Sequence, residues 1–475
     1  MSDQPKRPDE IRYAPTDGLT YNPNVPLYWD KTALDRETAR TFDLCNSCRL
    51  CFKYCQSFPT LFDAVDRHGD VRLIPPEKRR QVIDECFQCK LCYTQCPYTE
   101  AERHAFKIDF PRLILRAKAV IRHEEGAKLR ERMLADPDVL GRVGRLFPSL
   151  ANWANRLRPN RIAMEKLGGI HRDKLLPEFH AQTFEGWFRA QTGGRQETSE
   201  GRHPVVLFGT CFVNYNRPTV GQAAFRVLAH NGCKVACPKL VCCGMPALDG
   251  GDVRGAQRKA KHNVRQLLPW AERGYKVAVI NPTCSLTIRQ EYPELLNDPA
   301  DPALAAAAKK VAEATRDLSE FLFELKQAGE FREDFLSTPN GPVACHAPCH
   351  LRMQSIGFRG RDLMRRIPGV KPRLVAECCG HDGTWAMKTE YFALAMKNGQ
   401  KAFDGMREAA ADLWTSDCPL AAIQFEQACG KQPLHPIEVL DRAYRTDGFP
   451  TPVGAAQQDG QVDRATGRTE REQMR

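Results

Sequence analysis

Two short runs of cysteine carry the clearest chemical signal in the sequence. "CNSCRLCFKYC" (residues 45–55) and "CFQCKLCYTQC" (residues 86–96) both have the spacing C-x2-C-x2-C-x3-C. This spacing is typical of cubane [4Fe–4S] clusters, in which the fourth cysteine of each run ligates the other cluster. Zinc sites use two separated CxxC pairs instead. We therefore predict two [4Fe–4S] clusters, one held by Cys45, Cys48, Cys51 and Cys96 and the other by Cys86, Cys89, Cys92 and Cys55.

Adjacent cysteines point to a second kind of site. Cys242–Cys243 and Cys378–Cys379 are both followed by glycine, in "LVCCGMPALDGGD" and "AECCGHDGTW". A disulfide between neighbouring residues is strained, so the recurrence favours two sulfurs that point at one metal centre. Neighbouring side chains of a strand point to opposite faces. Aiming both thiols at one centre needs a sharply bent backbone, and we expect the following glycine to supply a φ that other residues rarely adopt.

Both pairs lie inside a repeated pattern of strands and helices. Residues 203–300 and 341–440 each place a cysteine after the first strand, the pair after the second and another cysteine after the third. The separation from first cysteine to pair is 31 and 29 residues, and from pair to last cysteine 41 and 39 residues. Parallel βαβ units gather ligands beyond the carboxyl ends of their strands. We predict one or two further iron–sulfur clusters, held by Cys211, Cys242, Cys243 and Cys284 and by Cys349, Cys378, Cys379 and Cys418.

These elements predict an α/β fold with an α-rich part, in which a helical dicluster ferredoxin domain precedes two repeated βαβ-type cysteine-rich domains. The expected organisation is an extended arm at 1–40, the [4Fe–4S] ferredoxin-type domain at 41–118, and a basic helical linker at 119–202. The cysteine-rich domains follow at 203–300 and 341–440, and a polar tail at 446–475 is expected to be disordered.

Composition excludes several classes of protein. The chain has 475 residues, 20 cysteines and a net charge of +11. Its first residues do not resemble a secretory signal peptide, and no apolar run reaches the roughly 18 residues of a membrane span. Disulfides are rare in reducing compartments, so we interpret the clustered cysteines as metal ligands or redox centres. No G-x-G-x-x-G follows a strand and no P-loop is present, so we expect no flavin or nucleotide site.

The paired pattern C…CCG…C resembles the cysteine-rich domains of the B subunit of heterodisulfide reductase and of the glycolate oxidase and lactate-utilisation iron–sulfur subunits. Over residues 41–440 the chain is similar to the family of C subunits of anaerobic glycerol-3-phosphate dehydrogenase, in "GTCFVNYNRP", "CCGMPALDGGD", "PTCSLTIRQEYPE" and "CHAPCHLR". The resemblance implies a protein that passes electrons from a flavin dehydrogenase toward membrane quinone. In heterodisulfide reductase a fifth cysteine completes each noncubane cluster. Here Thr287 and Ala421 stand at those positions.

Three functions are compatible with these motifs. The favoured one is an electron-transfer subunit between a flavoprotein dehydrogenase and the membrane quinone pool, reached directly or through a partner, with no catalytic residue of its own. The alternative is a thiol–disulfide reductase that uses a cysteine-rich centre, which needs an open iron coordination site. The third, a structural or nucleic-acid-binding iron–sulfur protein suggested by the charge, is disfavoured by four cysteine groups, so we expect no nucleic acid partner. The expected location is the cytoplasm, peripheral to the inner membrane.

Several residues have both a functional and an ordinary interpretation. His346, His350 and His381 flank the second cysteine-rich centre, where they could bond to cluster sulfurs or serve in ordinary packing. Cys233, Cys237, Cys345 and Cys429 fit buried structural thiols.

Residues 139–164 contain five arginines and no acidic residue. Val139, Val143, Leu146, Leu150, Trp153 and Leu157 recur at helical spacing, with Pro148 expected to kink or split the helix. Such a helix either lies on an anionic membrane or packs on the ferredoxin domain of its own chain.

Overall fold

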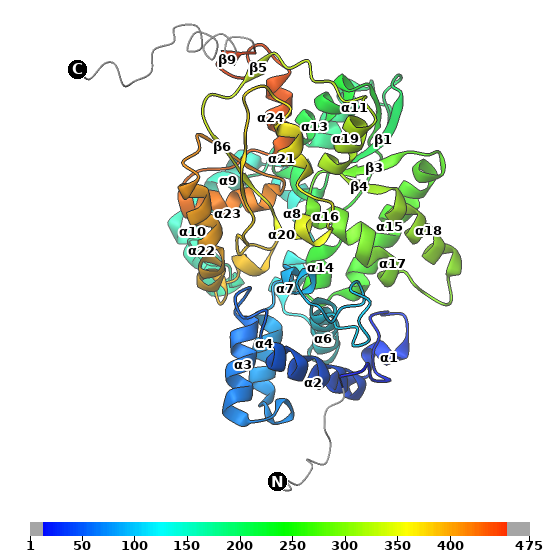
Figure 1. Cartoon of the computed structure of the whole chain (residues 1–475), viewed down its shortest axis with the longest axis vertical. Coiled ribbons are helices and arrows are strands. Elements are labelled where there is room, and N and C mark those ends of the chain that lie inside the picture. Colours follow the sequence, from blue (N-terminus) through cyan, green and yellow to red (C-terminus); the bar gives the residue numbers. More distant parts are fainter. Residues whose placement is uncertain (1–12, 454–475) are drawn as a thin grey trace, which may run out of the picture.

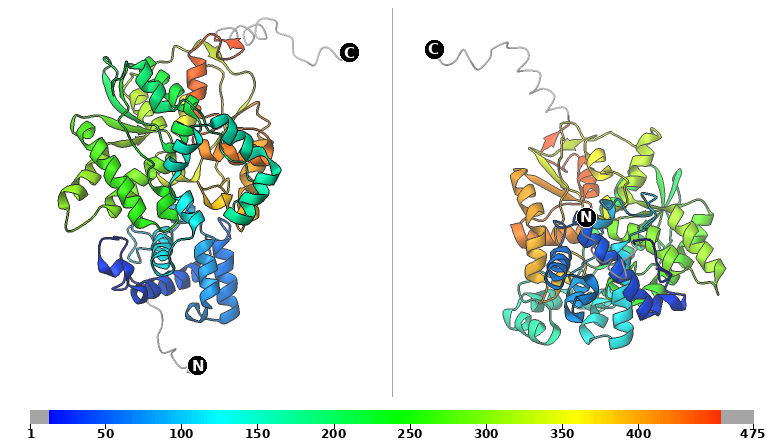
Figure 2. Two further views of the ribbon diagram at one scale, coloured as in Figure 1. Left: turned by 180° about the vertical axis from the view of Figure 1, so that it is seen from behind. Right: turned by 60° about the horizontal axis from the view of Figure 1, so that its bottom comes forward.

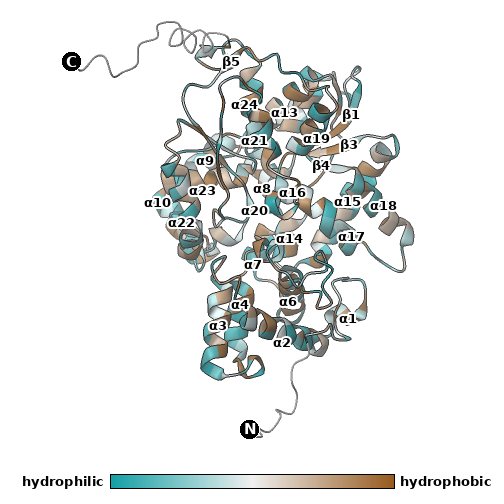
Figure 3. Ribbon diagram, viewed as in Figure 1, coloured by the Kyte–Doolittle hydropathy of each residue, from teal (hydrophilic) through white to brown (hydrophobic). Residues whose placement is uncertain are grey.

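The computed structural model describes residues 13–453, and residues 1–12 and 454–475 lie outside the described part. Figure 1 shows helices of the N-terminal third below two α/β units, the first drawn in green and the second in yellow and orange. The chain is thus the expected mixture of α/β units and an α-rich part. Strands β1 (His203–Phe208) and β3 (Lys276–Val279) of the first sheet are largely brown in Figure 3, as expected for strands enclosed by helices.

The N-terminal third is built of helices. They are α1 (Pro26–Trp29), α2 (Lys31–Cys48), α3 (Ser57–His68), the 3-10 turn η1 (Val71–Leu73), α4 (Pro76–Asp84), α5 (Leu91–Thr94) and α6 (Phe110–Glu125). Leu61, Phe62, Val82, Leu113 and Ile114 form the centre of its core. The two cysteine runs lie at the ends of α2 and α4, where the chain leaves the helices.

The expected extended arm at 1–40 is wrong for residues 26–40. Asp30 caps α2, because its side chain accepts a hydrogen bond from the backbone N–H of Ala33. The buried face of α2 includes Glu37 and Arg40, which form an ion pair 1% exposed on each side. These polar residues interrupt the apolar periodicity, which is why the sequence does not reveal the helix.

The segment expected as a helical linker contains α7 (Leu129–Leu134), α8 (Pro137–Gly144), α9 (Pro148–Arg156), α10 (Arg158–Gly168) and α11 (Phe184–Gln191). Pro148 stands at the first turn of α9 and so splits the expected single helix in two. Phe184 and Phe188 of α11 are fully buried in the core of the first α/β unit. Residues 184–191 therefore belong structurally to that unit and not to a linker.

The first α/β unit contains a parallel sheet with strand order β2-β1-β3-β4. Its elements are β1 (His203–Phe208), α12 (Cys211–Tyr215), α13 (Pro218–His230), β2 (Cys233–Ala236), α14 (Met245–Asp249), α15 (Val253–Glu272), β3 (Lys276–Val279), α16 (Pro282–Leu286), the π-helical turn η2 (Thr287–Glu291), α17 (Tyr292–Leu295), α18 (Pro302–Ala314) and β4 (Thr315–Asp317). Because β4 joins this sheet, the unit does not end at residue 300 as expected.

The second unit repeats this order in a parallel sheet β7-β6-β8, which Leu434 extends by a parallel bridge to Thr415. Its elements are β6 (Val343–His346), α20 (Cys349–Met353), α21 (Arg359–Met364), β7 (Arg373–Val375), the turn η3 (Trp385–Met387), α22 (Phe392–Glu408), β8 (Leu413–Ser416), α23 (Pro419–Cys429) and α24 (Pro436–Ala443). Leu434 takes the place that β4 has in the first unit, so the repeat extends beyond the three strands expected from the sequence.

The two units share one core. Val205 and Leu207 of β1 belong to the same buried cluster as Val343 of β6 and Leu440 of α24. Helix α19 (Leu318–Gln327) connects the units. The expected disordered tail at 446–475 is wrong for residues 446–453, because β9 (Thr451–Pro452) pairs with β5 (Ser337–Thr338). Residues 454–475 lie outside the described residues.

Within residues 13–453, no helix combines the length and the apolar character that crossing a bilayer requires.

Candidate iron–sulfur centres

Set I, defined as Cys45, Cys48, Cys51 and Cys96, lies between the end of α2 and the turn after α5. All four cysteines line one cavity of about 330 Å³, together with Phe58, Tyr98 and Ile108. Burial and the neighbouring thiols Cys51, Cys96 and Cys48 raise the pKa of Cys45. The structure therefore brings the fourth cysteine of the second run to the first three cysteines of the first run.

Set II, defined as Cys55, Cys86, Cys89 and Cys92, lies on the loop between α4 and α5 and at the start of α3. Burial raises the pKa of Cys55, and so do the nearby thiols Cys89 and Cys86. The loop turns tightly because Gln88 (φ 56°) and Lys90 (φ 60°) both adopt the left-handed conformation. This wraps three cysteines around one point and places Cys55 beside them.

Set III, defined as Cys211, Cys242, Cys243 and Cys284, lies at the carboxyl ends of β1, β2 and β3. All four cysteines pack in one buried cluster and line one cavity. The four thiols therefore form one continuous group.

Set IV, defined as Cys349, Cys378, Cys379 and Cys418, occupies the matching position in the second unit. Burial raises the pKa of Cys349, and Cys379 and Cys418 contribute to the same increase. Cys378 in turn interacts with Cys349 and Cys379. The repeat thus delivers four thiols to the edge of each sheet.

Both cysteine pairs depend on the glycine that follows them. Gly244 has φ 92° and Gly380 has φ 68°, both in the left-handed region. A Cβ on Gly380 would lie 2.0 Å from the carbonyl oxygen of Ala395, and one on Gly244 would lie 3.3 Å from Cα of Ala256. The expected role of the glycine as the bend after each pair is confirmed.

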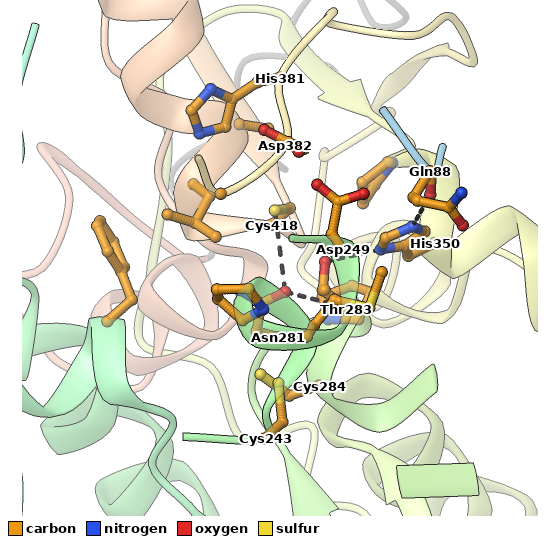
Figure 4. Close-up of a pocket in the computed structure, with 18 of the residues that line it drawn as sticks. Gln88, Cys243, Asp249, Asn281, Thr283, Cys284, His350, His381, Asp382 and Cys418 are labelled. Atoms are coloured by element: carbon orange, nitrogen blue, oxygen red, sulfur yellow. Dashed lines mark hydrogen bonds between the residues drawn. The ribbon is translucent and has the colours of Figure 1, made fainter. Parts of the chain in front are cut away.

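Sets III and IV face one central cavity, which Cys89 of set II also lines. Figure 4 shows Cys243 and Cys284 on one side of this cavity, with Cys418, His381 and Asp382 across from them. Asn281 lies between the two sets, 3.9 Å from the thiol of Cys418. Two α/β units and the helical part therefore enclose the cavity together.

Contacts connect the four sets in sequence. The thiol of Cys51 in set I lies 3.9 Å from the carbonyl oxygen of Cys92 in set II. Cys89 of set II packs in one buried cluster with Cys378 of set IV. The thiol of Cys418 in set IV lies 3.9 Å from the side chain of Asn281, whose backbone carbonyl accepts a hydrogen bond from the N–H of Cys284 in set III. The order along this string is I, II, IV and III.

The donor chemistry of the sets fits iron–sulfur clusters. All twenty cysteines lie in the described part of the chain, and none forms a disulfide. Buried thiols this close together cannot all ionise without nearby cations, because their negative charges would repel. Groups of cysteine thiolates are the usual protein ligands of iron–sulfur clusters, so the donor sets fit such clusters.

The three histidines near set IV have different surroundings. His346 bonds to the hydroxyl of Ser416 (2.9 Å) and the carbonyl of Glu377 (3.1 Å), so it serves ordinary packing. His350 bonds to the carbonyl of Gln88 (2.7 Å) and the hydroxyl of Thr283 (2.8 Å) and thereby connects all three parts of the chain. His381 is 8% exposed and lines the central cavity, and neither of its ring nitrogens has a protein partner. Its free N–H is available to a cluster sulfide or thiolate.

Sequence reasoning missed the polar residues around the cavity. Burial, followed by its interaction with Asp249, raises the pKa of Asp382. Lys118 of α6 donates to Asp249 and to the carbonyl of Cys86, each at 2.8 Å. Burial also lowers the pKa of Lys174, near Cys379, to about 8. The sequence offered one hint of these residues, namely their place in the repeat. Asn281 comes just after a strand, and Asp249 comes shortly after a cysteine pair.

The remaining cysteines lie away from the four sets. Cys233, Cys237 and Cys345 belong to the shared core, and Cys429 packs beside the core of the second unit. Thr287 donates its hydroxyl to the carbonyl of Thr283 at 2.7 Å, whereas Ala421 lines the central cavity. Neither residue supplies a fifth thiolate.

Comparison with known proteins agrees with the repeat. A family model described as "Cysteine-rich domain" (CCG) matches residues 205–289 and 343–426. The chain is 28% identical over 322 residues to the C subunit of anaerobic glycerol-3-phosphate dehydrogenase of Escherichia coli K12, an alignment that covers 66% of this chain and 77% of that protein.

Lactate utilization protein A of Bacillus cytotoxicus is 30% identical over 220 residues, which cover 45% of this chain and 87% of that protein. The protein of the same name from Bacillus cereus G9842 has the same identity and coverage. The chain therefore belongs to the family of lactate utilization protein A, and it is similar to the C subunit of anaerobic glycerol-3-phosphate dehydrogenase.

Proposed function

We propose that the protein is the iron–sulfur electron-transfer subunit of an oxidoreductase complex, with [4Fe–4S] clusters in sets I and II and further clusters in sets III and IV. Its electrons would pass between a flavoprotein dehydrogenase and the membrane quinone pool, reached directly or through a partner. The observation that supports this most is the string of contacts I, II, IV, III. Iron–sulfur clusters, when bound, accept and release single electrons.

The string has one end near solvent and one end in the interior. Cys48 of set I is exposed, and Leu50 and Phe52 beside it are 52% and 62% exposed. Set III lies in the central cavity, where Cys242, Cys243 and Cys284 are buried. We infer that a partner protein docks at set I, because this is where an electron can enter or leave with the shortest path through protein.

Replacing Cys89 with alanine tests the function at the middle of the string. We expect loss of an EPR-visible cubane and loss of partner-dependent quinone reduction, while the partner still reduces artificial dyes that accept electrons directly from its flavin. Cys429→Ala, which changes a cysteine outside all four sets, is the matched control and should keep both activities. Equal loss of both activities in Cys89→Ala, from a complex that remains assembled, would contradict electron transfer through this chain.

Iron content tests the number of centres. Anaerobically reconstituted protein should hold more than the roughly eight irons that two cubane clusters contain. Cys242→Ser and Cys379→Ser should each lower that content and leave the cubane EPR signals intact. If the wild type holds eight irons and neither variant changes the value, sets III and IV bind no cluster.

The central cavity favours a second candidate, a thiol–disulfide reductase. Two cysteine sets face the same cavity as His381, whose ring nitrogens have no partner among the described residues. The dithionite-reduced protein, mixed with small disulfides, should then oxidise with release of thiols. Absence of thiol release with clusters intact would leave electron transfer as the function.

A further inference from the structure

Exposed apolar side chains are concentrated in one segment of the chain. Of the fifteen large apolar side chains that are exposed among residues 13–453, ten lie within residues 129–167. Single exposed apolar residues are normal, but a contiguous group marks an interaction site. We call its centre the α8–α10 surface, defined by Val139, Val143, Leu146, Phe147, Leu150, Trp153 and Leu157.

In an ordinary surface helix the apolar face packs on the protein. In α8 and α9 the apolar face points to solvent instead. Gly141 of α8 approaches Tyr215 so closely that a Cβ there would lie 2.4 Å from its ring. Asn152 of α9 bonds to the backbone of Phe179 through both its amide nitrogen (3.0 Å) and its amide oxygen (2.9 Å). Small and polar residues thus attach the helices to the protein, while Phe147 (72% exposed) and Trp153 (58% exposed) point outward.

The expected alternative, a helix whose apolar face packs on the ferredoxin domain, does not occur. All seven side chains that define the surface are exposed. In Figures 1 and 2, α9 and α10 lie at the outside of the molecule beside α22 and α23, away from α2 and α3. No other part of residues 13–453 therefore covers the apolar face of this segment.

Positive charge surrounds this apolar face. Arg142, Arg145, Arg156 and Arg158 are exposed, and residues 139–164 contain no Asp or Glu. Glu178 neutralises part of this charge through its ion pair with Arg156. An apolar face with a tryptophan and a fringe of arginine is the pattern of a helix that lies in the interface of an anionic membrane.

We infer that the α8–α10 surface binds the protein to an anionic lipid surface. This deepens the proposed function, because it names the surface by which the chain itself would reach a membrane. The apolar side chains enter the region between headgroups and acyl chains, and the arginines bind the lipid phosphates.

Cosedimentation of purified holoprotein with vesicles tests the inference without any redox reaction. The protein should bind vesicles of phosphatidylcholine and phosphatidylglycerol at low salt, bind those of phosphatidylcholine alone far more weakly, and be released by high salt. Brominated lipids should quench part of the tryptophan fluorescence, and Trp153→Phe should remove that part.

Two variants separate the apolar from the electrostatic contribution. Phe147→Ser with Trp153→Ser should lower vesicle affinity at least tenfold, whereas Leu73→Ser with Leu336→Ser, which also changes two exposed apolar residues, should not. Replacing Arg142, Arg145, Arg156 and Arg158 by glutamine should lower affinity roughly fivefold per arginine. The control replaces four exposed arginines elsewhere, Arg195, Arg202, Arg254 and Arg258, by glutamine. Iron content and thermal unfolding should be unchanged in every variant.

Two results would overturn the inference. One is wild-type protein that stays in the supernatant with anionic vesicles at low salt. The other is a self-associated protein that becomes monomeric in Phe147→Ser with Trp153→Ser, since the surface would then bind a second copy. Neither result affects electron transfer, which the Cys89→Ala experiment tests separately.

Discussion

At the scale of single residues, Asp382 has the most unusual environment in the central cavity. Its Oδ1 accepts hydrogen bonds from the backbone N–H groups of Thr384, Trp385 and Ala386. Burial raises its pKa to about 7, and the neighbouring Asp249 adds to the increase, because two buried carboxylates cannot both be charged at little cost. Lys118 and Lys388 oppose this increase without cancelling it.

The raised pKa predicts how stability changes with pH. Between pH 4 and 7 the folded protein holds a proton on Asp382 that the unfolded chain releases, so this group's contribution to stability falls as pH rises. Asp382→Asn resembles the protonated carboxyl, since its amide oxygen accepts and its NH2 donates. We expect the free energy of unfolding of the variant relative to wild type to rise across this range by about 4 kcal/mol, which a growing difference in melting temperature would show. A difference that stays constant with pH would contradict a protonated Asp382.

The sequence predicts the role of a residue only where the spacing of several residues is typical of a known kind of site. The cysteines of all four sets could be grouped in advance because cluster-binding runs and the repeat have fixed spacings. Asp249, Asp382 and Lys118 could not, because Lys118 lies on α6, 131 residues before its partner Asp249. A lone aspartate or lysine has no spacing pattern, and only the docking of the three parts brings these side chains together.

At the scale of elements, the strand-to-helix turns after the cysteine pairs predict a graded effect of glycine substitution. Gly380→Ala should unfold or distort set IV, because its Cβ would overlap the carbonyl oxygen of Ala395. Gly244→Ala should cost less, roughly 1–3 kcal/mol, because it forces a left-handed conformation with little overlap. Gly430→Ala is the matched control, with φ 67° and no atom within 4 Å of a Cβ.

Iron content and melting temperature measure this series. We expect Gly380→Ala to lose the iron of set IV, Gly244→Ala to keep most of its iron with a lower melting temperature, and Gly430→Ala to keep all of it. Equal behaviour of Gly380→Ala and Gly430→Ala would show that the close approach to Ala395 has no structural role.

The sequence predicts well those elements in which apolar residues recur at regular spacing. It does not predict elements whose buried face carries charged residues as well as apolar ones. The strands β1, β3, β6 and β8 and the helices α13, α15 and α22 lie where apolar runs and helical patterns predicted them. Helix α2 was missed because the ion pair of Glu37 and Arg40 replaces apolar contacts on its buried side. Strand β4 was missed because only three residues, Thr315–Asp317, pair with β3.

At the scale of the whole molecule, the most deeply buried ion pair between the helical part and the first α/β unit joins two elements far apart in the sequence. Lys90, between two cysteines of set II, pairs with Glu291, and their side chains are 3% and 6% exposed. Burial alone would raise the pKa of Glu291, but Lys90 and Arg112 lower it to about 2. The contribution of the pair is therefore complete above pH 4.5 and is lost as pH falls toward 2.

Removing either residue of this ion pair should weaken the attachment of the helical part to the first α/β unit. Glu291→Gln leaves the Lys90 ammonium buried without a countercharge, which costs about 3–5 kcal/mol. We expect a lower melting temperature and faster proteolysis between residues 118 and 203. Lys90→Met combined with Glu291→Leu should recover much of the loss, because an apolar pair of similar volume carries no buried charge. Failure of the double variant to recover would mean that Lys90 acts on set II and not on the junction.

The enclosure of sets II, III and IV by three parts of one chain has a consequence for biosynthesis. An assembled cluster is too large to diffuse between closed domains, so the scaffold proteins that deliver iron and sulfide must reach these thiols before the parts dock. Under the proposed function, cluster delivery therefore precedes docking of the parts. We expect a chain made under iron starvation to be more sensitive to proteases, because it lacks the clusters that would join the three parts.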